Sequence, residues 1–194
     1  MTYERIDARR LQLDARELSA RLGAPTDPSD DGIGAALERI YSVANPAYTA
    51  IRVKIKRENG CIYIGRFKSE STGLRTLVSD SSECILLEAT LGAGVDRLLL
   101  KTAGTSAHDA FVLDAVADAL IEALCDLAEE RITDGLPASG RFSPGYSDLE
   151  LAMGEEILAL TDSSRMLGIR LTDGGMMIPR KSVNAIIAIK NVQV

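Results

Sequence analysis

The sequence predicts an α+β domain in which an antiparallel β-sheet packs against long helices. One observation behind this prediction is a hairpin pattern, since residues 48–57 and 61–67 alternate apolar and polar side chains on either side of Asn59-Gly60. Asn-Gly is the dipeptide most typical of a two-residue turn between antiparallel strands. The other is a helical apolar pattern that runs from Ser106, with Asp109 three residues on as in a capping box, to about residue 132.

Residues 1–46 are expected to form an N-terminal helical segment in front of an α+β core of residues 47–194, within one continuous domain. Leucines at helical spacing predict a first helix over residues 7–22, which a Gly and a Pro then end. Residues 24–31, rich in Pro and Asp, are interpreted as a loop, and a second helix is predicted over residues 33–43.

The middle of the chain is interpreted as a short helix over residues 71–78 and a buried strand over residues 84–91, whose apolar run is continuous. Gly92-Ala93-Gly94 follows that strand and leads into a helical pattern over residues 95–100. A Gly-rich turn at this position can cradle phosphate, but this one lacks the third Gly and the Lys-Ser/Thr pair of such loops. A tight connecting turn is therefore the favoured interpretation.

Acidic residues recur at every fourth position along the long helix. They are Asp114, Asp118, Glu122, Asp126 and Glu130. Like charges at this spacing destabilise an isolated helix by roughly 0.2 to 0.5 kcal/mol per pair. Most of these acids are interpreted as a solvated face, and one or two that face the segment at Arg141 could supply a carboxylate to a cationic ligand.

The last third of the chain predicts a helix, a hairpin and a strand. The helix is expected over residues 147–160, with Asp148 near its positive N-terminal end. Residues 166–171 and 176–179 flank a Gly-rich turn as a hairpin, and residues 183–189 are interpreted as a buried strand.

The composition limits the classes of function. A net charge of −6 gives no electrostatic footprint for nucleic acid, and the basic residues of 52–57 alternate with apolar ones, as on the wet face of a strand. No signal peptide or apolar run long enough to span a membrane is recognised, so a cytoplasmic protein is expected.

The cysteines and the lone histidine add little chemistry. Cys61, Cys84 and Cys125 are isolated and odd in number, which favours a reducing compartment, and Cys125 is expected in the core. His108 is the only histidine and is expected to be exposed in the first turn of the long helix, so a His-based metal site or hydrolase is disfavoured.

The segment 141–146, with sequence Arg-Phe-Ser-Pro-Gly-Tyr, is the strongest candidate for a binding site. Pro144 and Gly145 allow a sharp turn and a close approach of the backbone to a ligand. Arg141 offers a planar fork of donors for a carboxylate or phosphate, and Tyr146 offers a stacking face. An ordinary Pro-Gly turn with a surface Arg is the alternative.

The run RFSPGYSDLE resembles the R-x-x-x-G-Y signature of the activation (reactivation) domain of cobalamin-dependent methionine synthase. Residues 112–132 are similar to that family's long helix, and residues 166–187 are similar to its Met- and Pro-containing hairpin. The first hundred residues resemble the short free-standing members of the family more closely, in which the sequence ATLGAGVDRLL of residues 89–99 is familiar. The resemblance implies the fold of the activation domain.

The resemblance also implies a site for S-adenosylmethionine. Arg141 would pair with the ligand's carboxylate and Glu122 would attract its ammonium group. Backbone groups of residues 142–145 and the ring of Tyr146 would complete the site. These implied binding residues are Glu122, Arg141, Phe142, Ser143, Pro144, Gly145 and Tyr146. A further acid near the start of the family's domain has no recognised counterpart, and the aromatic residue expected after its Ser-Val pair falls at Ile186-Ile187.

The implied function is that of a reactivation factor. Cobalamin carried by a partner, a methionine synthase or corrinoid protein without its own activation domain, would be reductively methylated with an electron from a flavodoxin- or ferredoxin-type donor. No acid–base pair is evident, so the contribution of this chain to catalysis would be positioning. Residues expected to contact the corrinoid partner are Met176, Met177, Pro179 and Arg180, with Lys181 completing a basic pair.

Two alternatives are left open. The chain could be a non-catalytic adaptor that caps a corrinoid protein without using S-adenosylmethionine. Less favoured is an S-adenosylmethionine sensor or an unrelated methyltransferase, because the Gly-rich loop and the following acid common to such enzymes are not evident.

Overall fold

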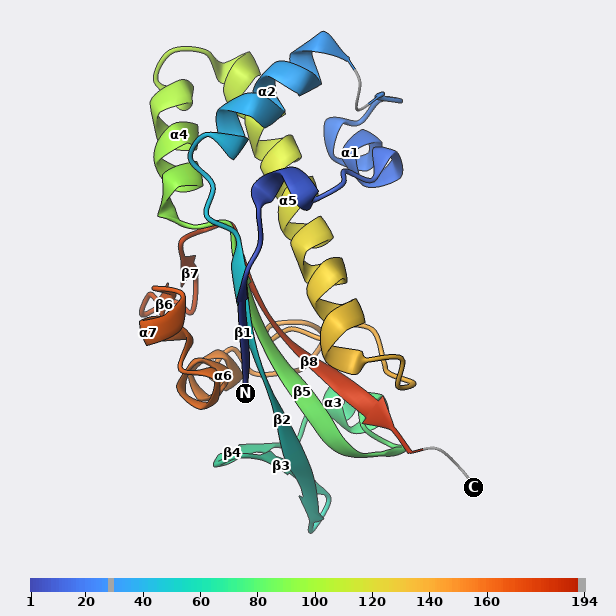
Figure 1. The fold of residues 1–194 in the computed structure, drawn as a ribbon. Coiled ribbons are helices and arrows are strands. Elements are labelled where there is room, and N and C mark those ends of the chain that lie inside the picture. Colours follow the sequence, from blue (N-terminus) through green and yellow to red (C-terminus); the bar gives the residue numbers. More distant parts are fainter. Residues whose placement is uncertain (28–29, 192–194) are drawn as a thin grey trace.

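The fold is an antiparallel sheet with helices on both faces, seen in a computed structural model that describes residues 1–27 and 30–191 (Figure 1). The strand order is β4-β3-β2-β5-β8, and β1 pairs with β2. Every strand pair of this sheet is antiparallel. The strands are β1 (Thr2–Arg5), β2 (Ala47–Glu58), β3 (Cys61–Ile64), β4 (Phe67–Ser69), β5 (Ser81–Thr90) and β8 (Ser182–Lys190). The predicted α+β class is confirmed.

The predicted hairpin turn is also confirmed. Glu58 pairs with Cys61, which leaves Asn59 and Gly60 as the two turn residues. Their φ angles are 50° and 77°, the left-handed values that this kind of hairpin turn requires at both positions. The sequence therefore sets the register of β2 against β3.

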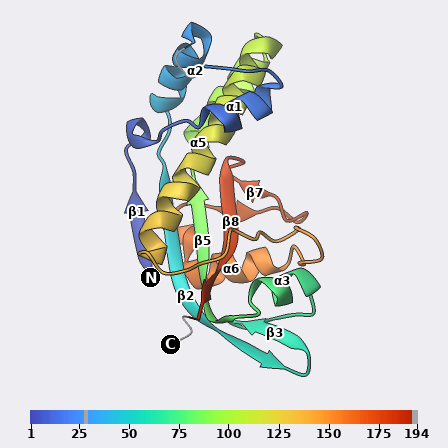
Figure 2. The ribbon, with the colours of Figure 1, turned by 90° about the vertical axis from the view of Figure 1, so that its right-hand side faces the viewer.

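The two faces of the sheet are covered by different helices. The long helix α5 (Ala107–Thr133) lies on one face with α1 (Ala15–Leu22), α2 (Asp31–Tyr41) and α4 (Ala93–Ala103). The other face packs against α3 (Thr72–Leu77) and α6 (Met153–Thr161), as Figure 2 shows. Leu86 of β5 belongs to the second core and Leu87 to the first, which explains why this strand is apolar on both faces.

The long helix is as predicted. Ser106 caps it by accepting a hydrogen bond from Asp109 N at 3.2 Å, and the helix ends at Thr133. Cys125 is fully buried and His108 is exposed in the first turn, both as expected. Cys61 and Cys84 are also buried, and all three cysteines are free thiols.

The N-terminal helix is shorter than predicted. Residues 7–22 are not one helix, because Asp7 caps a short 3₁₀ turn (Ala8–Arg10) and Asp14 caps α1. Each of these carboxylates accepts a backbone hydrogen bond that starts a new turn. Strand β1 was not predicted, since four mostly exposed residues give no alternation to detect. The predicted loop 24–31 falls partly outside the described residues, which lack 28 and 29.

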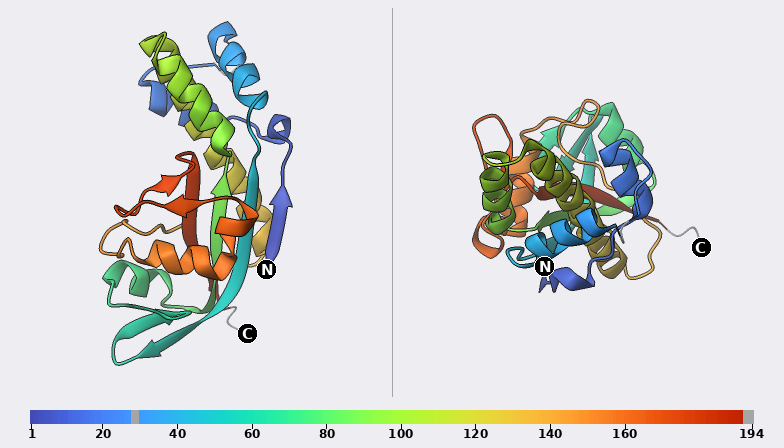
Figure 3. Two further views of the ribbon diagram at one scale, coloured as in Figure 1. Left: turned by 90° about the vertical axis from the view of Figure 1, so that its left-hand side faces the viewer. Right: turned by 90° about the horizontal axis from the view of Figure 1, so that it is seen from above.

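Residues 61–67 are not one strand, because the chain turns back at Gly65, whose φ is +59°, and β4 pairs antiparallel with β3. Helix α7 (Ser163–Met166) was not predicted, and the other elements have shifted ends. Helix α7 follows α6, and β6 (Arg170–Leu171) pairs with β7 (Met177–Ile178) as a small hairpin of its own. The left view of Figure 3 shows this C-terminal part on one side of the sheet and the N-terminal helices at one end.

Glu88 is a fully buried carboxylic acid in the central strand β5. It lies between Thr49 of β2 and Asn184 of β8, and neither of its oxygens has a hydrogen-bond partner among the described residues. Burial raises the pKa of Glu88 well above its ordinary value. The folded state therefore favours the protonated form of this side chain.

This burial predicts how stability depends on pH. Above the ordinary pKa of a Glu side chain, folded Glu88 holds a proton that the unfolded chain has released. The free energy of unfolding should then fall by about 1.4 kcal/mol per pH unit until the folded carboxyl also ionises. Glu88→Gln should remove this fall and be more stable than the wild type at pH 8, measured by urea unfolding at pH 5 and 8. Glu58→Gln, at the exposed hairpin tip, is the control. Identical pH dependence in Glu88→Gln and wild type would contradict the prediction.

Candidate functional site around Arg141

The candidate segment is held against the edge of β8. Phe142 and Ile186 form an antiparallel bridge, with Phe142 N donating to Ile186 O at 3.0 Å and Ile186 N to Phe142 O at 2.8 Å. The Phe142 ring packs, partly buried, against the second core and lies beside Gly73 of α3. Because neighbouring side chains of an extended segment point to opposite faces, Arg141 is directed toward α5.

Arg141 is bound by three carboxylates of α5. Its Nη2 lies 2.9 Å from Glu122 Oε2, and its Nη1 lies 2.7 Å from Asp126 Oδ1 and 3.1 Å from Glu129 Oε2. The Arg141 side chain is only 21% exposed. The structure thus brings together Arg141 and Glu122, both predicted as site residues, and adds Asp126 and Glu129.

Charge and burial act in opposite directions on Arg141. Partial burial lowers the pKa of Arg141, and its hydrogen bond to Asp126 and the charges of nearby acids outweigh this effect, so the pKa lies above its ordinary value. Three carboxylates around one guanidinium leave this cluster with a surplus of negative charge. Such a cluster favours a ligand that carries positive charge.

The acidic face of α5 is not the mainly solvated stripe that was expected. Lys181 Nζ lies 2.8 Å from Asp114 Oδ1 and also pairs with Asp118. Arg21 Nη1 lies 3.2 Å from Asp118 Oδ2, and its Nη2 lies 3.7 Å from Glu122 Oε1. Cations from three distant segments therefore offset part of the negative charge of this face, which the helix sequence alone could not reveal.

Two cavities meet at Arg141. The larger is about 450 Å³ and the smaller about 140 Å³. Glu122, Asp126 and Arg141 line both cavities. The other residues of the larger cavity are Glu129, Gly140, Ser143, Tyr146 and Val183, and those of the smaller are Gln12, Asp14, Glu17, Ala119 and Ala123. The larger cavity has the size of a small-molecule site.

The smaller cavity contains residues that the sequence did not single out. Gln12, Asp14 and Glu17 come from the N-terminal segment and reach the cavity because α1 packs on α5. Asp14 also caps α1, and Glu17 pairs with Arg21 at 2.6 Å. No sequence motif marks these residues, since only the packing of α1 brings them near Arg141.

The turn that follows Arg141 depends on Gly145. Its φ is +87°, and a Cβ atom at this position would lie 2.9 Å from Leu151 Cδ2. The turn is closed by Tyr146 N, which donates to Ser143 O at 3.1 Å, and it leaves Tyr146 68% exposed beside the larger cavity. Ser143 and Pro144 are partly buried and line a further cavity of about 160 Å³.

That further cavity is bounded by the β6–β7 hairpin, where the predicted partner contacts lie. Met177 lines the cavity, and Met176 is 70% exposed. Arg180 is exposed, whereas Pro179 is buried and Lys181 is only 6% exposed. The expected basic pair is therefore wrong as a surface feature, because Lys181 turns inward to the acids of α5.

The predicted helix over residues 147–160 begins only at Met153, because Asp148 has another role. Asp148 Oδ1 accepts from Ser71 Oγ at 2.6 Å and from Gly73 N at 3.0 Å, and Oδ2 accepts from Thr72 N at 2.7 Å. The hydrogen bonds from Ser71, Thr72 and Gly73 hold the pKa of Asp148 well below its ordinary value. An acid at a helix N-terminus was predicted, but the helix is α3 rather than α6.

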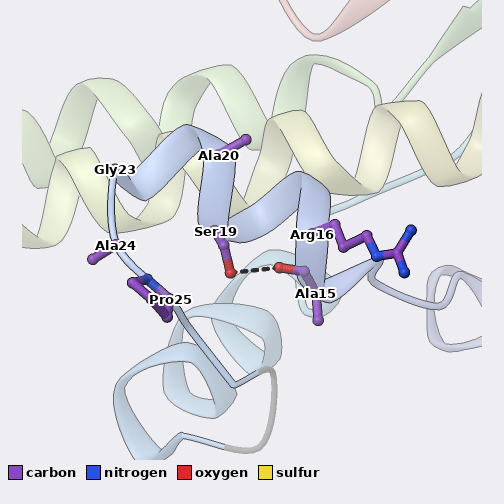
Figure 4. A pocket seen from close by; sticks show the side chains of 7 residues that line it. All are labelled: Ala15, Arg16, Ser19, Ala20, Gly23, Ala24 and Pro25. Carbon is purple, nitrogen blue, oxygen red and sulfur yellow. Dashed lines mark hydrogen bonds between the residues drawn. The ribbon is translucent and has the colours of Figure 1, made fainter.

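Another hollow of the surface lies between α1 and the residues that follow it (Figure 4). Its volume is about 560 Å³, and it is lined mostly by small apolar side chains. Ser19 Oγ donates to Ala15 O at 2.6 Å, and Arg16 points away from Ala24 and Pro25. Polar groups do not converge here, so the chemistry favours the cavities at Arg141.

Neither a metal site nor a membrane-spanning helix is found in the part of the chain that the structure describes. Across residues 1–27 and 30–191, no three His, Cys, Asp or Glu side chains are grouped so that they could hold a metal ion. None of the helices described is long and apolar enough to cross a membrane.

Comparison with known proteins shows the fold. No protein-family model matches the chain, and no curated protein matches its sequence. Among solved structures, the crystal structure of the MetH reactivation domain bound to AdoHcy matches with a TM-score of 0.70 and 17% identity. The match covers 100% of this chain and 80% of that one. The chain therefore has the fold of this reactivation domain, as the resemblance implied.

Asp148 provides a test of how the turn after Arg141 is anchored. Asp148→Ala should lower the free energy of unfolding at pH 7, because it removes the acceptor of the α3 N-terminus. Because the pKa of Asp148 is lowered in the fold, its contribution to stability is present above the ordinary Asp pKa of about 3.9 and is lost as pH falls below that value. The difference in free energy of unfolding between Asp148→Ala and wild type should therefore shrink below about pH 3.9. Urea unfolding at pH 7 and pH 3.5 measures both effects, with exposed Asp173→Ala as control. If Asp148→Ala is as stable as wild type at pH 7, the anchoring role is excluded.

Proposed function

We propose that this chain binds S-adenosylmethionine at Arg141 and supports reductive methylation of a partner's corrinoid. The observation that carries the proposal is the Arg141 cluster beside a cavity of about 450 Å³, on the fold of a domain that was crystallised with AdoHcy. S-adenosylmethionine differs from AdoHcy by one methyl group and one positive charge on sulfur.

The charges of the cluster fit those of the ligand. S-adenosylmethionine carries a carboxylate, an ammonium group and a sulfonium group. Arg141 would receive the carboxylate in a bidentate pair, in exchange for part of its bonds to the exposed Asp126. Glu122 and the other acids around it would attract the ammonium group. The surplus of acids favours the cationic sulfonium over a neutral thioether.

The backbone turn would hold the rest of the ligand. Gly145 leaves room for a close approach of the main chain, and the exposed ring of Tyr146 offers a stacking surface for adenine. Phe142 faces the core, so its contribution is limited to backbone groups.

The reaction needs one electron and one methyl group. The partner's corrinoid, once supplied with one electron by a flavodoxin- or ferredoxin-type donor, would provide the nucleophile for the methyl group. S-adenosylmethionine would give up that methyl group and keep the electron pair of the broken carbon–sulfur bond on sulfur. This chain contributes by holding the sulfonium methyl group toward the partner, since positioning alone can supply a large rate effect.

A second candidate function is an adaptor that caps a corrinoid protein without using S-adenosylmethionine. The observation that favours it is that Arg141 is already paired with three carboxylates of its own chain. Exposed apolar side chains near the β6–β7 hairpin, such as Leu151, Met176 and Ile178, would then serve only for partner contact.

Calorimetric titration with S-adenosylmethionine tests the binding site. Arg141→Ala and Glu122→Ala should each weaken binding by roughly tenfold or more, as expected for the loss of a charge-assisted hydrogen bond. Arg165→Ala and Glu155→Ala remove the same charges at exposed positions outside the cavities and should bind like wild type.

The two functions differ in what happens with the corrinoid partner. Absence of binding by the wild type at millimolar S-adenosylmethionine, both alone and with the partner, contradicts the proposed function. Partner pull-down that survives Arg141→Ala, together with that absence, supports the adaptor. Recovery of turnover by an oxidised partner, dependent on the electron donor and on S-adenosylmethionine, supports reactivation.

A further inference from the structure

Positive charge is concentrated in one part of this acidic chain. Strands β2 to β4, residues 47–69, contain six basic and one acidic side chain, a net charge of +5. The rest of the chain contains 16 basic and 27 acidic side chains, a net charge of −11. A charge separation of this size creates a directional field around the molecule.

The basic side chains share an uncovered face of the sheet. Along β2, Tyr48 and Ala50 face α5 and are buried in the first core. Arg52, Lys54 and Lys56 continue on the same face because side chains alternate along a strand, and all three are exposed. Figures 1 and 2 show the reason, since the β2–β3 hairpin projects beyond the helices that cover the rest of this face.

The pairing of the strands extends this surface sideways. Lys56 lies opposite Tyr63 of β3, and Tyr63 lies opposite Lys68 of β4. These residues form one row across three strands, on the same face as Lys54. We call the surface made by Arg52, Lys54, Lys56, Tyr63 and Lys68 the basic strip.

The charges of the basic strip are available to a partner. Arg52 pairs with Glu83 at 2.7 Å and Lys68 with Glu70 at 3.2 Å, and about half of each basic side chain remains exposed. Exposed ion pairs of this kind contribute little to stability, so a carboxylate of a partner could replace Glu83 or Glu70. Lys54 and Lys56 make no ion pair with any residue in the described ranges 1–27 and 30–191.

We propose that the basic strip docks an acidic surface of a partner protein. Its residues along β2, Arg52 to Lys56, span only about 13 Å at the usual rise of a strand. A nucleic acid would extend past the strip onto the acidic remainder of the chain, where it is repelled. A compact acidic patch on a protein can contact the basic strip without reaching the acidic remainder of the chain. The electric field of the whole molecule would orient the partner as it approaches.

The basic strip and the Arg141 cavities can be occupied together. The strip lies toward the β4 edge of the sheet, whereas the segment with Arg141 lies along β8 at the other edge. The inference therefore does not depend on the proposed function, and loss of S-adenosylmethionine binding would not affect it.

Fluorescence anisotropy with a labelled oligo-glutamate peptide tests the basic strip. The wild-type chain should bind the peptide, more weakly as salt increases. Lys54→Glu combined with Lys56→Glu should weaken binding by about tenfold or more, because two attractions become repulsions. Arg97→Glu combined with Lys101→Glu changes the net charge equally at exposed positions of α4 and should bind like wild type.

Three results would overturn the inference. They are no binding by the wild type, equal loss in the α4 variant, or tighter binding of an oligonucleotide or of anionic phosphatidylserine vesicles than of the peptide. Lys54→Gln with Lys56→Gln, a milder change, should give a smaller loss in the same direction, and thermal unfolding checks that each variant is folded.

Discussion

The ion-pair cluster between Arg141 and α5 is the interaction on which the candidate site depends. The segment that carries Arg141 has no helix or long strand of its own. It is held on one side by the bridge between Phe142 and Ile186 and on the other by the carboxylates of Glu122, Asp126 and Glu129. Phe142 packs, partly buried, against the second core while Arg141 reaches α5, so the segment connects the two cores of the molecule. Removal of either anchor would free the turn that contains Gly145 and Tyr146.

The repeated acidic residues of α5 are offset by cations that are distant in sequence and close in the fold. Repeated acids on one helix repel each other by a few tenths of a kcal/mol per pair, roughly 0.2 to 0.5. Lys181, Arg21 and Arg141 offset this repulsion, and each comes from a different part of the chain. The helix thus gathers the N-terminal segment, the start of β8 and the Arg141 segment along one face. Arg21 and Arg141 both contact Glu122. A ligand that replaces Glu122 as a partner of Arg141 would therefore also change the contact between Glu122 and Arg21.

Local patterns predicted most of the fold, and long-range contacts account for what they missed. Asn59-Gly60 specified a turn, and Ser106 specified the start of α5, because both signals act within a few residues. Asp148 was assigned to the wrong helix, since its hydrogen bonds go to residues more than seventy positions away. Lys181 looked like surface in the sequence, and only packing against α5 reveals that it is buried. The same limit applies to Asp14 and Glu17, whose place beside Arg141 follows from how α1 packs.

Binding of S-adenosylmethionine between α5 and the turn after Arg141 can be measured by hydrogen exchange of the full chain, with and without saturating ligand. If the ligand binds there, the amides of residues 140–147, of the adjoining turns of α5 around Glu122 and Asp126, and of residues 12–17 exchange more slowly. Protection confined to the hollow beside α1 and Pro25, or unchanged exchange across residues 140–147 with ligand bound, would contradict binding at this site.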